Sequence, residues 1–326
     1  MKGTHSLTVS SAHLKFEIEL SRNITVIQGD SATGKTTLVD MIREFNLNGT
    51  DTGITLSCDL PCKVIEGADW QSQLSNIESS IVFIDEGNRF VSSKDFARAV
   101  RGSGNYYVIV TREPLSNLPY SVTEIYGIHS SGKFQSLEPV YHHLYRIYGD
   151  MLGQDSYQNG QIIIEDSNSG FDFFYNVFGE DDKRCVSAGG AGNIFSIIEG
   201  SLDGNAILII ADGAAFGSQM SKVSYAINRK HGISIYLPES CEWLILSSGI
   251  IDDAVVREIM DNPSEYIESA DYFSWERFFN ALLIQKTKDT WMQYSKTKLN
   301  PTYLEGRYRE KIIAVLPESI RKIISE

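Results

Sequence analysis

Eight consecutive residues near the N-terminus have the types and the spacing that are needed to hold phosphate groups. They follow the pattern G-x-x-x-x-G-K-[ST] and are Gly29, Asp30, Ser31, Ala32, Thr33, Gly34, Lys35 and Thr36. The glycines let backbone N–H groups turn toward phosphates, Lys35 can reach the β- and γ-phosphates, and Thr36 can ligate Mg²⁺. With Thr37 at the start of the following helix, this segment predicts a site for a nucleoside triphosphate and Mg²⁺.

A pair of acids follows an apolar run some fifty residues later. Ile81-Val82-Phe83-Ile84 predicts a buried strand, and Asp85 and Glu86 come directly after it. Taken alone, this pattern is also typical of a buried strand that is followed by a solvated acidic turn. Together with the glycine-rich segment it resembles the Walker A and Walker B elements of P-loop ATPases. The resemblance implies that Asp85 holds Mg²⁺, directly or through water, and that Glu86 activates the attacking water, with Lys35 as the second catalytic residue.

A third apolar run, Tyr107 to Val110, ends in Thr111 and Arg112. Many P-loop ATPases place a polar sensor or an arginine near the γ-phosphate at this point, which would give Arg112 a role in the site. The alternative is that Arg112 is a surface arginine at a strand end. The N-K-x-D element by which GTPases read guanine is absent from the sequence. We therefore expect the nucleotide to be ATP.

Two further acids stand at strand ends in the second half of the chain. Glu165 follows the apolar run Gln161 to Ile164, and Asp212 follows Ala206 to Ala211. Because catalytic groups gather at the carboxyl ends of parallel strands, both acids are expected to face one crevice. The structural alternative is that Glu165 and Asp212 only cap the helices that follow these strands.

This arrangement resembles the Toprim domain of topoisomerases, primases and OLD-class nucleases. That fold carries a glutamate after its first strand and D-x-D after its third, and these hold Mg²⁺. On the resemblance Glu165 and Asp212 are metal ligands, but Ala214 stands where the second aspartate belongs. Asp166 or Glu239 would have to replace it, or the module is degenerate and does not cleave. OLD-class proteins also join an N-terminal P-loop ATPase to a C-terminal Toprim domain.

The elements that position these residues fall into two α/β halves with a helical end. The predicted strands are Leu14–Leu20, Ile24–Gln28, Lys63–Ile65, Ile81–Ile84, Tyr106–Thr111 and Glu124–Ile128, then Gln161–Ile164, Cys185–Ser187, Ala206–Ala211 and Ile233–Leu237. The predicted fold is an N-terminal P-loop NTPase parallel sheet (1–130), a linker or β-extension (131–159), a Toprim-like α/β unit (160–250) and a helical C-terminal segment (251–326).

Composition restricts the cellular location that we expect for the protein. It has 326 residues, of which 42% are hydrophobic, and four cysteines, too few and too irregular for a disulfide framework. It has no uninterrupted apolar stretch of the roughly 18–20 residues that span a membrane, and Met1 to Ser10 lack a signal-peptide pattern. We expect a cytoplasmic protein without a membrane partner.

The net charge of −13 argues against general binding to nucleic acid, yet residues 272–326 contain ten Lys and Arg and only six Asp and Glu. If nucleic acid is a partner, these basic C-terminal helices are its predicted contact, but a solvated helix face or an oligomer contact is the favoured interpretation of the same residues. The expected partner is a nucleotide, and nucleic acid, a second copy and another protein are the alternatives for a further one. The leading hypothesis is an ATPase that regulates a Toprim-like domain. A nucleotide-gated binding protein without nuclease activity and a small-molecule kinase-like enzyme are the alternatives.

Overall fold

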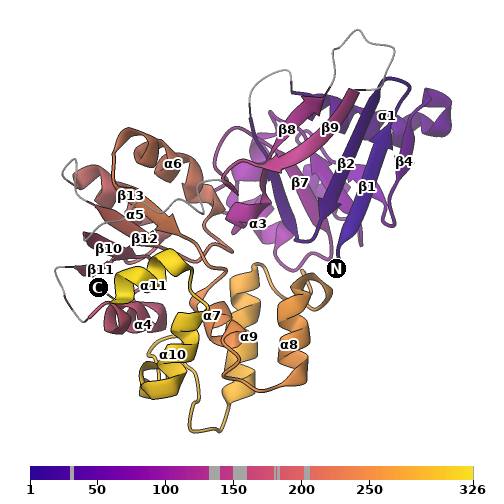
Figure 1. Ribbon diagram of the computed structural model, residues 1–326. Coiled ribbons are helices and arrows are strands. Elements are labelled where there is room, and N and C mark those ends of the chain that lie inside the picture. The colour runs from indigo at the N-terminus through magenta and orange to yellow at the C-terminus, as the bar shows by residue number, and fades with distance from the viewer. Residues whose placement is uncertain are drawn as a thin grey trace. The chain divides into compact units, whose positions relative to one another are not determined.

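The computed structural model describes residues 1–29, 33–131, 140–149, 160–179, 181, 184–201 and 206–325. It divides into two compact α/β units. Unit 1 comprises Met1–Ile147 and Ser264–Ser274, and unit 2 comprises Tyr148–Pro263 and Trp275–Glu326 (Figure 1). The segment Ser264–Ser274 belongs to unit 1 because it is hydrogen-bonded to the N-terminus, where the Gly3 N–H donates to the Ser264 carbonyl over 2.7 Å.

Among the described residues, unit 1 contains one large curled sheet of nine strands, ordered β4-β1-β2-β9-β8-β3-β7-β6-β5. The strands are β1 (His5–Ser10), β2 (Leu14–Leu20), β3 (Ile24–Ile27), β4 (Thr55–Ser57), β5 (Cys62–Val64), β6 (Ile81–Ile84), β7 (Tyr106–Val110), β8 (Ile125–Ser131) and β9 (Val140–Arg146). Strands β8, β3, β7, β6 and β5 pair in parallel. Strand β1 is antiparallel to both β2 and β4, and β9 is parallel to β2 and antiparallel to β8.

The helix α1 (Lys35–Asn48) packs against this sheet through one apolar face. Its Leu38, Val39 and Ile42 are fully buried in a core that also receives residues from β1, β2, β3, β6 and β7. Two shorter helices, α2 (Trp70–Leu74) and α3 (Lys94–Val100), complete the regular helices described in unit 1. Because α1 begins at Lys35, within the last two residues of the predicted phosphate loop, its burial fixes that end of the loop.

Unit 2 has a four-stranded, fully parallel sheet in the order β11-β10-β12-β13 among the described residues. Its strands are β10 (Gln161–Ile164), β11 (Cys185–Ser187), β12 (Ile207–Ile210) and β13 (Ile233–Tyr236). The chain runs from β10 outward to β11 and returns to β12 on the other side of β10. The carboxyl ends of β10 and β12 therefore border the crevice where such sheets bind ligands.

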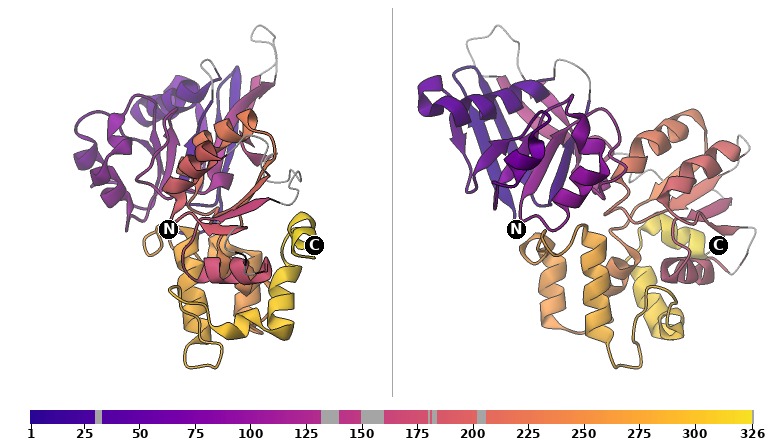
Figure 2. Two further views of the ribbon diagram at one scale, coloured as in Figure 1. Left: turned by 90° about the vertical axis from the view of Figure 1, so that its left-hand side faces the viewer. Right: turned by 180° about the vertical axis from the view of Figure 1, so that it is seen from behind.

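The helices of unit 2 include a C-terminal group drawn in orange to yellow in Figures 1 and 2. The helices are α4 (Ser169–Val177), α5 (Ala191–Gly200), α6 (Met220–Arg229), α7 (Cys241–Ser247), α8 (Ala254–Asp261), α9 (Trp275–Thr287), α10 (Gly306–Ala314) and α11 (Glu318–Ser325). Helix α9 buries Phe278, Phe279, Leu282 and Leu283 and lies in the segment 251–326 that was predicted to be helical.

The structure differs from the sequence prediction in two strands of unit 1, β1 and β4, which were not predicted. Strand β9 lies inside the segment 131–159, for which a linker or a β-extension was predicted, and it agrees with the β-extension. The remainder of that segment at 132–139 and 150–159 lies outside the described residues. Strand β9 inserts between β2 and β8, so this part of the segment is an integral strand of the sheet.

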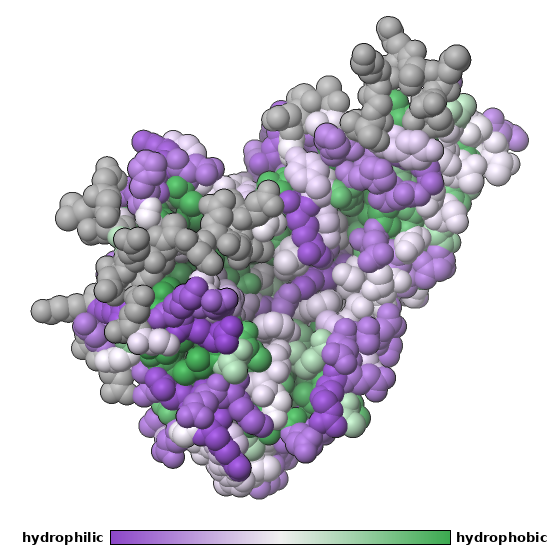
Figure 3. All heavy atoms as spheres, viewed as in Figure 1, coloured by the Kyte–Doolittle hydropathy of each residue, from purple (hydrophilic) through white to green (hydrophobic). Residues whose placement is uncertain are grey.

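The surface mixes residue types on the face drawn in Figure 3, where hydrophilic side chains cover much of both units and smaller hydrophobic areas lie among them. Among the described residues, the most exposed large hydrophobic residues are Leu47 at 73% and Trp291 at 63%. In the part of the chain that the structure describes, no helix is both long and apolar enough to cross a bilayer.

Candidate functional site

The predicted phosphate loop connects β3 to α1 and carries its lysine inward. Gly29 (φ +121°) and Gly34 (φ +91°) adopt backbone angles that favour glycine. Lys35 is only 5% exposed, and its Nζ donates to the Gly29 carbonyl at 2.9 Å and to Thr33 Oγ1 at 3.1 Å. The ammonium thus lies within the loop formed by its own motif. Asp30, Ser31 and Ala32 lie outside the described residues, and Thr37 is half-buried in the first turn of α1.

The first predicted acid lies beside the loop. Thr36 Oγ1 is 3.4 Å from Asp85 Oδ1, although the two residues belong to elements far apart in the chain. Strand order brings them together, because β7 alone separates β3 from β6. Burial raises the pKa of Asp85 above its usual value, and the Thr36 hydroxyl opposes this shift. A hydroxyl and a carboxylate at this separation are oxygen ligands of the kind Mg²⁺ prefers, so these residues fit that ion.

The second predicted acid is held by the predicted arginine. Glu86 Oε1 and Arg112 Nε are 2.7 Å apart, and their side chains are 35% and 55% exposed. Both line a pocket of about 270 Å³ at the ends of β6 and β7, together with Asp85, Thr111 and Asn88. The pocket is therefore bordered by every polar residue that the sequence predicted after these two strands.

A histidine without a predicted role lies against the loop. His142 of β9 stacks on Phe16 of β2, with ring centroids 4.4 Å apart and planes at 9°. A Cβ on Gly34 would lie 3.2 Å from its Cε1. Burial lowers the pKa of His142. Its neighbour His143 is exposed on the opposite face of the strand, as expected for adjacent residues. Only the pairing of β9 with β2 brings His142 here, and no local sequence pattern indicates it.

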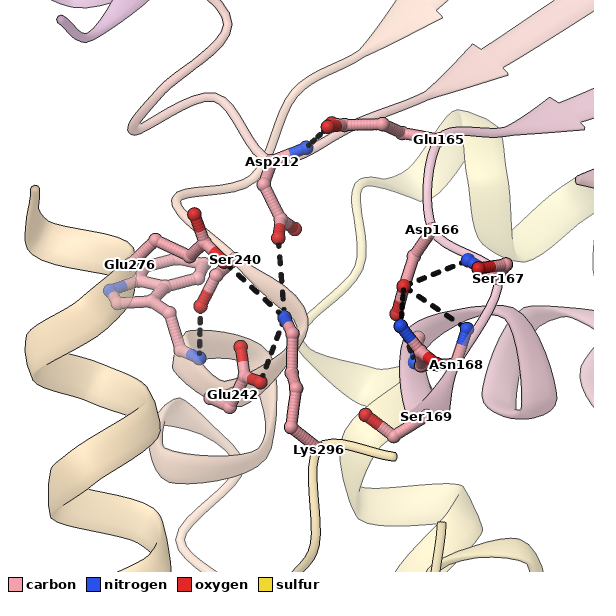
Figure 4. Close-up of polar contacts among 12 residues, drawn as sticks. Glu165, Asp166, Ser167, Asn168, Ser169, Asp212, Ser240, Glu242, Glu276 and Lys296 are labelled. Carbon is pink, nitrogen blue, oxygen red and sulfur yellow. Dashed lines mark hydrogen bonds and ion pairs between the residues drawn. The ribbon is translucent and has the colours of Figure 1, made fainter. Parts of the chain in front are cut away.

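In unit 2 the structure brings Glu165 and Asp212 together at the ends of adjacent strands (Figure 4). The Asp212 backbone N–H donates to Glu165 Oε2 over 3.0 Å. Burial raises the pKa of both carboxyls. The Glu165 carboxylate is thus directed at the backbone of Asp212, while the Asp212 side chain points away from it toward Lys296.

Lys296 occupies the space in front of Asp212, which the sequence did not predict. Its Nζ lies 3.0 Å from Glu242 Oε1, 3.4 Å from Glu276 Oε1 and 3.6 Å from Asp212 Oδ2. Burial alone would lower the pKa of Lys296, but Asp212, Glu242 and Glu276 together raise it above its ordinary value. We call Asp212, Glu242, Glu276 and Lys296 the Lys296 cluster.

The residues considered as a replacement for the absent second aspartate have other positions. Asp166 accepts hydrogen bonds from the backbone N–H groups of Ser167, Asn168 and Gly170 at 2.8–3.0 Å, and so it organises the turn before α4. Ala214 is buried, and its N–H donates to the Glu239 carbonyl. Within the described residues, no three His, Cys, Asp or Glu side chains group as a metal site. The acids of unit 2 therefore do not fit Mg²⁺.

Comparisons with known proteins do not assign a family. No protein-family model matches the chain, and no curated protein matches its sequence. Function must therefore be inferred from the residues and their contacts.

Proposed function

We propose that unit 1 binds ATP with Mg²⁺ and hydrolyses it. The observation that supports this most is the meeting of two motifs: Thr36, from the glycine-rich segment, lies 3.4 Å from Asp85, from the acidic strand end. Each motif alone has a structural explanation. Their convergence beside a buried lysine is what a phosphate and metal site requires.

Each residue then has a defined role. Lys35 and the N-terminus of α1 would hold phosphate oxygens, and Thr36 and Asp85 would hold Mg²⁺, which neutralises phosphate charge when bound. Glu86 would accept a proton from the attacking water. Arg112 would position Glu86 through their ion pair. The adjacent acids favour water as the acceptor over the metabolite that a kinase-like enzyme would use.

We further propose that this ATPase works in the cytoplasm and that its nucleotide state regulates unit 2 as a Toprim-like module that does not cleave. Two observations in unit 2 support the absence of cleavage. Ala214 stands at the second aspartate position, and Lys296 lies against Asp212. Two-metal cleavage needs several carboxylates to hold two ions about 4 Å apart. Ala214 and Lys296 supply no carboxylate.

The two roles of the nucleotide site can be separated by two substitutions. Lys35→Ala should weaken ATP binding by at least ~10-fold, because a charge-assisted hydrogen bond contributes about 1.5–3 kcal/mol. Glu86→Gln should leave ATP affinity nearly unchanged and slow hydrolysis by ~10² to 10⁴-fold, as expected for loss of a general base. Isothermal titration calorimetry and phosphate release measure the two effects.

Lys63→Ala provides the matched control, since Lys63 is an exposed lysine of β5 in the same unit. It should change neither measurement. ATP affinity in Lys35→Ala equal to that of the wild type would refute nucleotide binding at this loop.

A further inference from the structure

A basic pocket in unit 1 lies apart from the residues that we propose to act on ATP. It has a volume of about 220 Å³, and the residues that line it are Lys94, Ala97 and Arg98 of α3, Arg101 at the end of α3, and Asn117. We call it the α3 pocket. Its three basic residues are spaced by four and three positions, so they lie on one face of the helix. Among the described residues that line the pocket, none is acidic.

The cations of the α3 pocket are not neutralised by the chain itself. The segment 89–112 contains five basic residues and one acid, Asp95, in a chain whose net charge is −13. Asp95 pairs with Arg98 at 2.8 Å, but both side chains are mostly exposed, and exposed pairs of this kind are weak. Lys94 and Arg101 form no ion pair with the residues that the structure describes. The pocket therefore keeps a net positive charge that attracts anions.

Two walls of the pocket are held in place by contacts within unit 1. The Arg101 guanidinium lies over the ring of Phe273, 5.3 Å from its centroid. A guanidinium over a ring can still donate through the N–H groups at its edge, which match phosphate oxygens in pairs. On the other side, Asn117 Nδ2 donates to the Ser92 carbonyl at 2.8 Å. The donors are thus positioned before any ligand arrives.

The size and the lining of the pocket indicate the class of ligand. Pockets that enclose a drug-sized molecule have roughly 300–1,000 Å³, and the α3 pocket is smaller. It has room for about seven waters at ~30 Å³ each. No aromatic side chain is among the described residues that line it, so it offers no ring on which a base could stack. The pocket therefore fits a phosphate group and not a whole nucleotide.

We propose that the α3 pocket binds a phosphate group, supplied by a free phosphate compound or by the backbone of a nucleic acid. Binding would not depend on base sequence, because phosphate contacts carry no sequence information directly. Ser92, whose carbonyl accepts from Asn117, also lines the pocket that contains Asp85 and Glu86. The two pockets are therefore neighbours within unit 1. The proposal does not depend on nucleotide binding at Gly29–Thr36.

Removing two cations of the α3 pocket should weaken phosphate binding. The test uses full-length protein carrying Lys35→Ala, so that the lysine of the glycine-rich segment does not hold the ligand, and pyrophosphate in metal-free buffer as the probe. Lys94→Gln with Arg101→Gln should weaken binding by at least ~10-fold in isothermal titration calorimetry, because each side chain donates a charge-assisted hydrogen bond. Arg101→Lys keeps the charge without the paired donors, so its loss should be smaller.

Lys2→Gln with Lys63→Gln is the matched control, since it removes the same two charges from exposed lysines of unit 1. It should change pyrophosphate affinity by less than ~2-fold, because salt screens exposed charges that are distant from the ligand. The melting temperature of the Lys94→Gln, Arg101→Gln protein should fall by no more than about 4 °C, since both side chains are exposed and only the contact over Phe273 is lost.

A second ligand distinguishes the two sources of phosphate. If backbone phosphates occupy the pocket, Lys94→Gln with Arg101→Gln should lower the salt slope of binding to single-stranded oligothymidine by ~0.7 per lost contact. That result assigns the site to nucleic acid, whether or not pyrophosphate binding also falls. An unchanged slope together with weakened pyrophosphate binding assigns it to a free phosphate compound.

The proposal would be overturned if the pocket variant and the Lys2→Gln, Lys63→Gln control behaved alike toward both pyrophosphate and oligothymidine. Absence of binding by every protein in the series counts as the same result. Lys94, Arg98 and Arg101 would then form a solvated helix face without a ligand.

Discussion

The ion pair between Arg112 and Glu86 gives the arginine a positioning role in the proposed hydrolysis. Arg112→Ala should reduce hydrolysis by about 10-fold, which corresponds to ~1.4 kcal/mol of transition-state stabilisation, because Glu86 loses the contact that orients it. Global stability should change little, since exposed ion pairs contribute about 0–1 kcal/mol. Phosphate release under saturating ATP, with thermal unfolding alongside, measures both quantities.

Arg112→Lys is the informative control, because a lysine can keep a single contact to Glu86 and should recover part of the rate. If Arg112→Ala instead weakens ATP affinity and leaves the turnover number unchanged, the arginine contacts the nucleotide and does not position the acid. Equal rates in wild type and Arg112→Ala would leave the surface-arginine interpretation standing.

Candidate site residues could be predicted from the sequence where they belong to one short motif. Lys35 and Thr36 are identified by their spacing from Gly29, and Asp85 by the apolar run before it. Glu165 and Asp212 were expected at one crevice and lie there, connected by a hydrogen bond. Lys296 was not predicted as their neighbour, because its position depends on how the α9–α10 segment packs. A lone lysine among other basic residues gives no local signal of such burial.

The contact between β9 and the phosphate loop provides a test at the level of elements. Gly34→Ala should destabilise unit 1 by ~1–3 kcal/mol, because alanine is strained at φ +91° and its methyl group meets the His142 ring. Gly29→Ala is the matched comparison, since Gly29 also has positive φ but none of the described residues lies within 4 Å of an added Cβ. Urea unfolding should therefore show the larger loss for Gly34→Ala.

His142→Ala should restore part of the stability of Gly34→Ala and none of the stability of Gly29→Ala. A coupling energy above about 0.5 kcal/mol between positions 34 and 142 would support the contact. Coupling near zero would show that the loop and β9 are independent.

Strands were predictable where an apolar run marks them. β2, β6, β10 and β11 have the predicted bounds, since buried strands read as continuous or alternating apolar residues. β9 has the sequence VYHHLYR, with exposed residues at several positions. Its tyrosines and histidines carry too weak a period to separate a half-exposed strand from a loop. Its place between β2 and β8 is decided by pairing over long sequence distances.

At the scale of the whole molecule, the structure distinguishes two kinds of basic residue in the segment 272–326. Lys286 forms an ion pair with Asp253 at 2.5 Å, and Lys296 is paired with the carboxylates of the Lys296 cluster. Both are therefore engaged within unit 2. Lys288, Lys298 and Arg309 form no ion pair with the described residues, and the first two are exposed. These three are candidates for contacts to an external anion.

An exposed aromatic group lies on the same basic segment. Trp291 is 63% exposed and meets Tyr308 edge-on at 5.3 Å, and the Arg307 guanidinium lies 4.9 Å from the Tyr308 ring centroid. Aromatic rings beside cations are the elements with which proteins stack the bases of single strands. The alternatives, a solvated helix face or a contact to a second copy, use the same residues without nucleic acid.

If the segment 272–326 binds nucleic acid, Lys288→Gln, Lys298→Gln and Arg309→Gln together should weaken duplex binding and lower the salt slope by ~0.9 per lost phosphate contact, because each contact releases condensed counterions. Trp291→Ala should weaken single-strand binding by ~1–3 kcal/mol with little change in that slope, since stacking is not ionic. Fluorescence anisotropy at several salt concentrations measures both.

Lys2→Gln with Lys63→Gln, two exposed lysines of unit 1, is the matched control. If the wild type shows no salt-dependent binding to either oligonucleotide, the basic segment serves another purpose, and sedimentation of the Trp291→Ala variant would then test the oligomer contact.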